Sequence, residues 1–242
     1  MKMYKKVMAA ALAGVMTVSM SATAFAADDD GYILKATNED SKSSDNDLVI
    51  AIEGSVSSMD PANIPDTNAI SATRGVYETL VSFDENQELT GKLAESWEVS
   101  DDSLTYTFKL RQGVKFQDGT DFNAAAVKAN YDRVVNKDNN LRQRRTFIVT
   151  NEDGSETPRV DSIETPDDYT LVIKLTQAWA PFINRLTQFC IISPAALEEY
   201  GNDIMNHPCG TGPYVCTEWE EGDHTSFERN DDYWETNRAL TL

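Results

Sequence analysis

The stretch Leu93–Phe122 reads LAESWEVSDDSLTYTFKLRQGVKFQDGTDF, and it carries the clearest structural pattern in the chain. Within it, Leu104–Leu110 alternates strictly between apolar and polar residues, which is typical of a strand with one buried face. Val114 and Phe116 lie between this strand and a turn at Asp118-Gly119. The stretch therefore predicts an antiparallel sheet that Val114 and Phe116 continue.

Elements of both kinds are expected on either side of this stretch. Asp66 can cap a helix that runs to about Leu80, and Asn123 can cap a second, amphipathic helix. A third helix is predicted to begin at Ser193-Pro194 and to end at Gly201. Further strands are expected at 48–52, where a continuous apolar run is typical of burial on both faces, and at 97–99, 169–175, 214–219 and 225–229. Helices and strands mix without strict alternation, so the fold class is α/β or α+β.

Composition excludes several classes of protein. The chain has 242 residues, 40% of them hydrophobic, which is enough for a packed core. With 21 Lys and Arg against 40 Asp and Glu, the formal net charge is −19. Such an acidic chain lacks the bases that neutralise phosphates, so we expect no nucleic-acid partner and no docking on an anionic membrane surface.

The N-terminus has the layout of a secretory signal peptide. Three lysines precede the apolar run Val7–Met20, and the small residues of Ala24-Phe25-Ala26 predict cleavage between Ala26 and Ala27. An uncleaved anchor is the alternative, but the run is short for a membrane span. No Cys lies near the cleavage site, so no lipid anchor is expected there. Residues 27–47 carry seven acids and two lysines, which predicts an acidic flexible linker.

The cysteines and histidines give no standard metal site. Cys209 and Cys216 either form a bridge or, with Cys190, act as small buried apolar residues. His207 and His224 supply zinc-type ligands near these cysteines, but the spacing fits no common zinc motif. We therefore expect no metal and no cofactor.

A basic segment stands out in this acidic chain. Lys128–Arg145 contains six bases and only two acids, and its last four residues include Arg142, Arg144 and Arg145. A guanidinium group binds a carboxylate with two parallel hydrogen bonds, so these arginines are candidates for gripping a peptide C-terminus or a chelator carboxylate. The alternative is that they pair with carboxylates of the protein itself.

The second candidate site is Glu53-Gly54-Ser55-Val56, which follows the first expected strand. Ligands of open α/β sheets gather beyond the carboxyl ends of strands, and an extended peptide can add its backbone to a sheet edge. Gly54 would let the main chain approach a ligand closely, and Ser55 offers a small donor. An ordinary turn between strand and loop explains the same residues, so both interpretations stay open.

Six blocks, in order, resemble the family 5 extracellular solute-binding proteins, which are the peptide, nickel and glutathione-type receptors of ABC importers. The most specific is Leu93–Phe122 itself, which is similar to the family signature over nearly its whole length. The other blocks are LVIAIEGSVSSMDP (Leu48–Pro61), VYETLVSF (Val76–Phe83), VDSIETPDDYTLVIKL (Val160–Leu175), GTGPY (Gly210–Tyr214) and ERNDDYW (Glu228–Trp234).

The resemblance implies an α/β fold like that of the type II periplasmic binding proteins, in truncated form. Family members are roughly twice this length, so we expect most of the first lobe and a small accessory subdomain, without the second lobe. The first lobe would comprise about 48–76 and 160–242, and the subdomain about 77–159. The resemblance also implies that an arginine near Arg144 contacts the ligand.

The implied function is that of the substrate-binding component of an ABC transporter, exported to the periplasm or the cell surface. It would capture a peptide-like or metal-chelate solute, work as a monomer and dock on a membrane permease. The alternative is a truncated remnant that binds nothing. A secreted hydrolase is a distant alternative, because the chain has neither Gly-x-Ser-x-Gly nor His-Glu-x-x-His and a pair of catalytic carboxylates cannot be identified from sequence. We therefore expect this chain to have no enzymatic activity.

Overall fold

The computed structural model describes residues 48–235, so the predicted signal peptide, its cleavage site at Ala26–Ala27 and the predicted linker lie outside the described residues. From Ile52 onward the described residues belong to one compact unit, which contains all the described helices and strands. None of the described helices has the length and apolarity that crossing a membrane requires.

The strand predicted at residues 48–52 is wrong. These residues have no regular secondary structure, and Val49 and Ile50 are 91% and 71% exposed. A run of apolar residues becomes a strand buried on both faces only when it joins a sheet and other elements cover both faces of that sheet. Among the described residues no strand pairs with this segment.

The main sheet has four antiparallel strands in the order β3-β4-β8-β7. They are β3 (Ala94–Val99), β4 (Thr105–Leu110), β8 (Thr170–Leu175) and β7 (Val160–Asp167). The alternation in β4 and β8 is confirmed, because every second side chain of these strands is buried in the core. The predicted boundary between lobe and subdomain falls between β6 and β7, whereas β4 and β8 pair across it. The predicted division would therefore have to cut through this sheet.

Val114 and Phe116 are buried but do not continue the sheet. Lys115, the residue between them, forms only an isolated antiparallel β-bridge, with Asp121. The predicted turn at Asp118-Gly119 is present, since Gly119 N–H donates to the carbonyl of Phe116 at 2.9 Å. These two side chains therefore fill the core from a turn and not from a strand.

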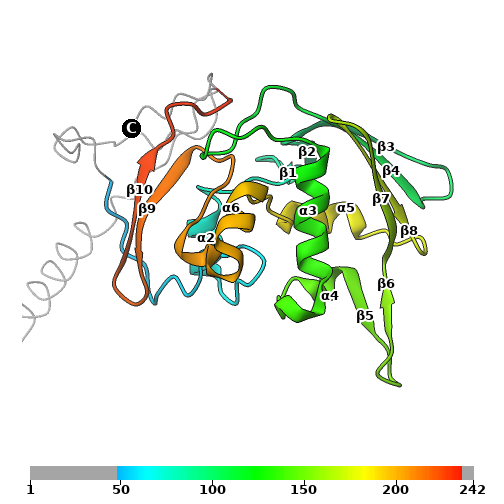
Figure 1. Cartoon of the computed structure of the whole chain (residues 1–242), viewed down its shortest axis with the longest axis horizontal. Coiled ribbons are helices and arrows are strands. Elements are labelled where there is room, and N and C mark those ends of the chain that lie inside the picture. Colours follow the sequence, from blue (N-terminus) through cyan, green and yellow to red (C-terminus); the bar gives the residue numbers. More distant parts are fainter. Residues whose placement is uncertain (1–47, 236–242) are drawn as a thin grey trace, which may run out of the picture. The chain divides into compact units, whose positions relative to one another are not determined.

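Helix α3 (Ala124–Val135) runs down the middle of the picture, with the four-stranded sheet on one side and the hairpin of β9 (Tyr214–Glu220) and β10 (His224–Arg229) on the other (Figure 1). Asn123 caps it as predicted, and its side chain accepts a hydrogen bond from Ala126 N–H at 2.9 Å. The buried side chain of Asn130 donates to the carbonyl of Ile192 at 2.7 Å and accepts from its N–H at 3.0 Å. This pair of hydrogen bonds fixes α3 to the segment that directly precedes helix α6 (Pro194–Tyr200).

The other two predicted helix starts are also confirmed, and one predicted length is wrong. Asp66 caps α2 (Thr67–Thr73), and Ser193 caps α6, which ends at Gly201 as expected. Helix α2 stops well short of Leu80, because the chain straightens there and buries Val76 and Leu80 among other elements. The remaining short elements are α4 (Arg144–Phe147), α5 (Phe182–Arg185), η2 (Lys137–Asn139), η3 (Leu186–Gln188), η4 (Gly201–Asn206), and the hairpins β1 (Val81–Phe83)–β2 (Leu89–Gly91) and β5 (Ile148–Thr150)–β6 (Glu156–Pro158).

The block GTGPY passes very close to the backbone that follows α2. A Cβ at Gly210 would stand 2.2 Å from the carbonyl oxygen of Val76, and one at Gly212 would stand 2.5 Å from that of Gly75. Both distances are shorter than side-chain contacts allow, so only glycine fits. The glycines therefore serve packing, and no helix follows them that would form a phosphate site.

A buried carboxylate ties four distant parts of the chain together. Glu78 is 5% exposed and accepts hydrogen bonds from Thr211 Oγ1 at 2.8 Å, Tyr233 Oη at 2.7 Å and Trp234 Nε1 at 2.7 Å. Its carboxylate also lies 3.1 Å from Nζ of Lys92. We call these five residues the Glu78 cluster.

Candidate ligand-binding hollow

A polar hollow of about 510 Å³ lies where two loops meet that are far apart in the sequence. One loop is the segment between the predicted site at 53–56 and helix α2, and the other joins η2 to α4. The residues that line the hollow are Ser57, Ser58, Asn63, Pro65, Asn140, Leu141 and Arg142. It is wide open to solvent and brings one guanidinium group together with hydroxyl and amide groups, a combination suited to a small polar ligand with an anionic group.

An ion pair holds the first loop in place. Asp60 is 6% exposed, and its two carboxylate oxygens lie 2.6 Å and 3.2 Å from the two Nη atoms of Arg133 on α3. The same carboxylate accepts from Ala62 N–H at 3.0 Å, while Asp60 N–H donates to Ser58 Oγ at 3.1 Å. The loop is therefore fixed to α3 through a charge that is almost fully paired.

A backbone hydrogen bond joins the second loop to the first, since Gln143 N–H donates to the carbonyl of Ala62 at 3.0 Å. The start of the second loop is also held to α3, because Asn139 Nδ2 donates to the carbonyl of Arg133 at 2.8 Å. Between Asn139 and Gln143, Asn140 adopts a left-handed conformation with φ of +49°. Asparagine tolerates this conformation better than most residues, which lets the chain turn here toward Arg142.

The three candidate arginines differ in what they contact. Arg144 donates from both Nη atoms to the carboxylate of Glu156, at 2.6 Å and 2.8 Å, and from Nε to the carbonyl of Val135 at 2.8 Å. The hydrogen bonds between Arg144 and Glu156 raise the pKa of the guanidinium and lower the pKa of the carboxyl. Arg142 and Arg145 are exposed, and no acid among the described residues pairs with either. Internal pairing, the alternative raised from the sequence, therefore holds for Arg144.

The predicted site at 53–56 lies next to the hollow without lining it. The carbonyl of Glu53 accepts from Asn68 Nδ2 on α2 at 2.7 Å, and that of Val56 accepts from Trp219 Nε1 on β9 at 2.9 Å. Gly54 has a φ of +93°, and Ser55 is exposed. The segment is thus held between α2 and β9, and the serines that do line the hollow, at positions 57 and 58, follow it directly.

Sequence reasoning missed most of the residues that line the hollow. The charge contrast pointed to Arg142, but uncharged side chains such as Asn63 and Asn140 leave no such signal. The pair Ser57-Ser58 directly before Met59-Asp60-Pro61 is the one local signal that was available. A smaller hollow of about 290 Å³ lies beside α3 and α6, but its guanidinium, that of Arg133, is already bound to Asp60.

The three cysteines are free, so the bridge considered between Cys209 and Cys216 is absent. Burial raises the pKa of Cys190 and of Cys209 to about 12, and that of Cys216 to about 11. Thiols with such pKa values stay protonated at neutral pH and are poor nucleophiles and metal ligands. Within the described part of the chain, these cysteines do not gather with His207 and His224 into a metal-binding group.

Comparisons with known proteins agree on one family. Residues 88–241 match the family described as "Bacterial extracellular solute-binding proteins, family 5 Middle". The glutathione-binding protein GsiB of Shigella dysenteriae serotype 1 is 38% identical over 224 residues, which cover 92% of this chain and 38% of that protein. GsiB of Salmonella typhi is 41% identical over 191 residues, or 78% of this chain and 35% of the relative. The chain thus spans little more than a third of the length of these curated relatives.

Solved structures give the same result. The periplasmic binding protein DppA of Helicobacter pylori, in complex with the peptide STSA, is 31% identical with a TM-score of 0.61, over 75% of this chain and 38% of that one. NikZ of Campylobacter jejuni, in complex with Ni(L-His), is 27% identical with a TM-score of 0.64, over 74% of this chain and 34% of NikZ. The fold of the described residues is therefore that of part of a type II periplasmic binding protein.

Proposed function

This chain belongs to the bacterial extracellular solute-binding proteins of family 5, and on that premise we propose that it captures a peptide-like or metal-chelate solute for an ABC importer. In this proposal it forms part of an exported substrate-binding component that processing releases between Ala26 and Ala27. Its partners would be the solute and a membrane permease, and it would act as a monomer without nucleic acid, cofactor or catalytic chemistry.

The observation that carries the proposal is the unpaired Arg142 in a polar hollow. Arg133, which lies behind the first loop, is committed to Asp60, whereas Arg142 faces the hollow without an acid of its own among the described residues. A guanidinium left free among hydroxyl and amide groups suits an anionic group of a ligand. On the opposite loop the hydroxyl of Ser57 already donates to the carboxylate of Asp66, whereas Ser58, whose Oγ accepts from Asp60 N–H, has no acceptor for its own hydroxyl among the described residues and can donate to a ligand.

Relatives narrow the class of solute. Their names and complexes include glutathione, a short peptide and nickel bound by histidine, and each of these carries at least one carboxylate. We propose that Arg142 binds that carboxylate and that the other predicted residues, Glu53–Val56, Arg144 and Arg145, lie at the border of the site and contact other parts of the solute. The bidentate pair between Arg144 and Glu156 makes Arg144 the weaker candidate for direct contact.

The test is calorimetric titration of the full chain with glutathione, the peptide STSA and the Ni(L-His) complex. We expect one of these solutes to bind with a Kd tighter than about 1 mM, and Arg142→Met to weaken that binding about tenfold or more, since a charged hydrogen bond contributes about 1.5–3 kcal/mol. Arg185→Met is the matched control, because Arg185 on α5 is equally exposed and lies outside the lining of the hollow.

Two results would contradict the proposal in different ways. If none of the three solutes binds more tightly than about 1 mM, the alternative of a chain that does not bind is supported. If a solute binds and Arg142→Met retains full affinity, the family function stands but the assignment of the carboxylate to Arg142 fails.

A further inference from the structure

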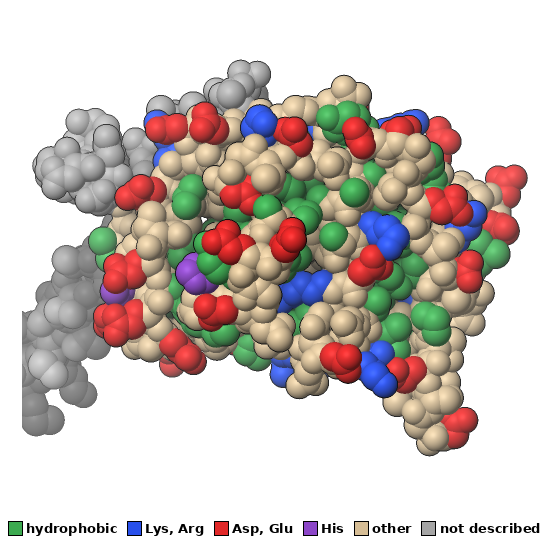
Figure 2. Space-filling model, viewed as in Figure 1, with side chains coloured by type: hydrophobic (Ala, Val, Ile, Leu, Met, Phe, Trp, Pro, Cys, Tyr) green, Lys and Arg blue, Asp and Glu red, His purple; other side chains and the backbone are tan. Residues whose placement is uncertain are grey.

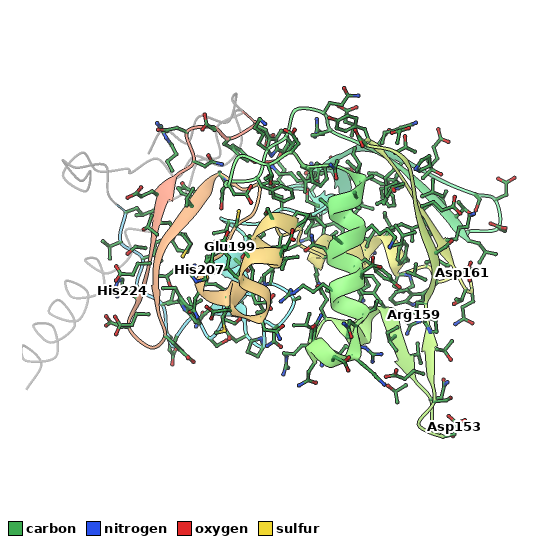
Figure 3. The ribbon with its side chains drawn as sticks, in the orientation of Figure 1. Asp153, Arg159, Asp161, Glu199, His207 and His224 are labelled. Carbon is green, nitrogen blue, oxygen red and sulfur yellow. The ribbon has the colours of Figure 1, made fainter. Side chains whose placement is uncertain are left out.

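A group of metal-ligand side chains lies on the β9–β10 hairpin, away from the hollow. The ligand atoms of Glu220, Asp223 and His224 all lie within 4.8 Å of one another, and the three side chains are exposed. A fourth, Glu218, has its carboxylate 3.2 Å from Nε2 of His224. Figure 2 shows a histidine among acidic side chains at the edge where Figure 3 labels His224.

The hairpin itself brings these residues together. In the register of the two strands, His224 is directly opposite Glu220, and Ser226 is opposite Glu218, so both glutamates lie on the strand face that carries the imidazole. Gly222 turns the chain with a φ of +85°, and Asp223 N–H donates to the carbonyl of Glu220 at 3.1 Å. Strand pairing therefore sets the positions of Glu218, Glu220 and His224, and the hydrogen-bonded turn sets that of Asp223.

The charge of this group is not balanced by the protein. Among the described residues no lysine or arginine forms an ion pair with Glu218, Glu220 or Asp223, and the only cationic group near them is the imidazole of His224. By contrast, Lys115, Lys128 and Lys174 each pair with an acid elsewhere on the surface. A cation that binds here would meet three carboxylates that share one imidazole.

The imidazole makes this more than a patch of acids. Its Nδ1 lies 2.9 Å from Asp223 and its Nε2 lies 3.2 Å from Glu218, so a carboxylate stands at each ring nitrogen. Histidines that bind metals use one ring nitrogen for the metal and donate the other N–H to a carboxylate, which fixes the ring. The arrangement around His224 provides both positions.

We propose that Glu220, Asp223 and His224 bind a divalent transition-metal cation such as Zn²⁺, and that Glu218 orients the imidazole. Imidazole nitrogen combined with carboxylate oxygen is a donor set that suits zinc and its neighbours in the first transition series. Such ligands stand about 2.0–2.2 Å from the metal, so in tetrahedral coordination two ligand atoms are about 3.4 Å apart. Small side-chain rotations on an exposed hairpin close the remaining difference.

The second histidine of the chain provides the matched comparison. His207 is as exposed as His224, 44% against 43% for the side chains, and also lies near an acid, with Nε2 3.5 Å from Asp203. Its ring, however, stacks on Tyr200 with centroids 3.9 Å apart, and it belongs to no metal-binding group among the described residues. Figure 3 shows the two histidines on separate elements.

The experiment is calorimetric titration of the full chain with ZnCl₂ in a buffer that does not coordinate metals. We expect one zinc site that His224→Ala weakens about tenfold or more, and that Glu220→Gln and Asp223→Asn also weaken. His207→Ala should leave the affinity unchanged, and so should Glu228→Gln, which removes one exposed acid from the same hairpin. Glu218→Gln should have a smaller effect than His224→Ala, because Glu218 acts through the imidazole.

Three outcomes would overturn the inference. Zinc binding weaker than millimolar would show that the group is a cluster of side chains only. Equal losses in His224→Ala and His207→Ala would place zinc elsewhere. Calcium binding as tight as zinc binding, and unaffected by His224→Ala, would reduce the site to the attraction of carboxylates for any divalent cation. None of these results depends on the solute bound at the hollow, so the two proposals fail separately.

Discussion

The Glu78 cluster and the polar hollow that contains Arg142 are both built from polar side chains that are distant in sequence. They differ in whether the charged group at the centre has partners within the protein. In the cluster a carboxylate with 5% exposure receives three hydrogen bonds and one ammonium group. In the hollow the guanidinium of Arg142 is exposed, and no described acid pairs with it.

Physical chemistry explains the difference. A charge taken out of water must be paired, because burying it alone costs several kcal/mol, and the fold provides every partner that Glu78 needs. A charge in an open hollow keeps its water and costs the fold little. Complete pairing thus indicates a structural role, and an unpaired charge in a concave place indicates a partner from outside. Substitutions at the two places should separate these roles.

The largest effect is expected for Glu78→Ala. The substitution removes the buried acceptor of Thr211 and Trp234 and one of the two acceptors of Tyr233, while Lys92 keeps its second acid, Glu235, at 2.7 Å. Each buried donor left without its acceptor costs about 1–3 kcal/mol, so the free energy of unfolding in urea should fall by about 3–5 kcal/mol. Glu85→Ala, at an exposed acid in the β1–β2 turn, should change it by less than about 0.5 kcal/mol. A similar small change for Glu78→Ala would contradict the structural role of the cluster.

A smaller loss of stability is expected for Arg133→Met, which breaks the ion pair between Arg133 and Asp60 that fixes the first loop of the hollow to α3. Asp60 would keep its hydrogen bond from Ala62 N–H, so the expected loss in unfolding free energy is about 2–3 kcal/mol. The double variant Asp60→Asn with Arg133→Met removes the stranded charge and should recover part of the loss. Urea unfolding of the wild type, Asp60→Asn, Arg133→Met and the double variant gives the coupling energy between the two side chains directly. A coupling energy near zero would show that the ion pair does not hold the loop.

The sequence predicted what local patterns determine. The alternation of Leu104–Leu110 and the caps at Asp66, Asn123 and Ser193 were confirmed, because each depends on residues a few positions apart. The prediction of a strand at 48–52 was wrong, since a doubly buried strand needs partner strands and covering elements that the local sequence does not reveal.

The same distinction applies to the candidate site. Contrast in charge was enough to single out Arg142 as a candidate, whereas the serines and asparagines beside it have no pattern that sets them apart from other loop residues. The partner of Arg144 could not be read from the sequence, because the β5–β6 hairpin brings Glu156 back over twelve positions. Which arginine remains free is therefore a property of the fold.

The smallest effect on stability is expected for Arg142→Met, and Arg144→Met sharpens the comparison from two positions away. Arg142 pairs with no described acid, so its replacement should change the unfolding free energy by less than about 0.5 kcal/mol. Arg144→Met strands Glu156 and frees the carbonyl of Val135, so it should lower the urea midpoint measurably. Arg145→Met, at a second exposed arginine without a described acid, should behave like Arg142→Met. If Arg142→Met destabilised the chain as much as Arg144→Met, Arg142 would be a structural residue, and a loss of ligand affinity in that variant could no longer be assigned to a contact with the solute.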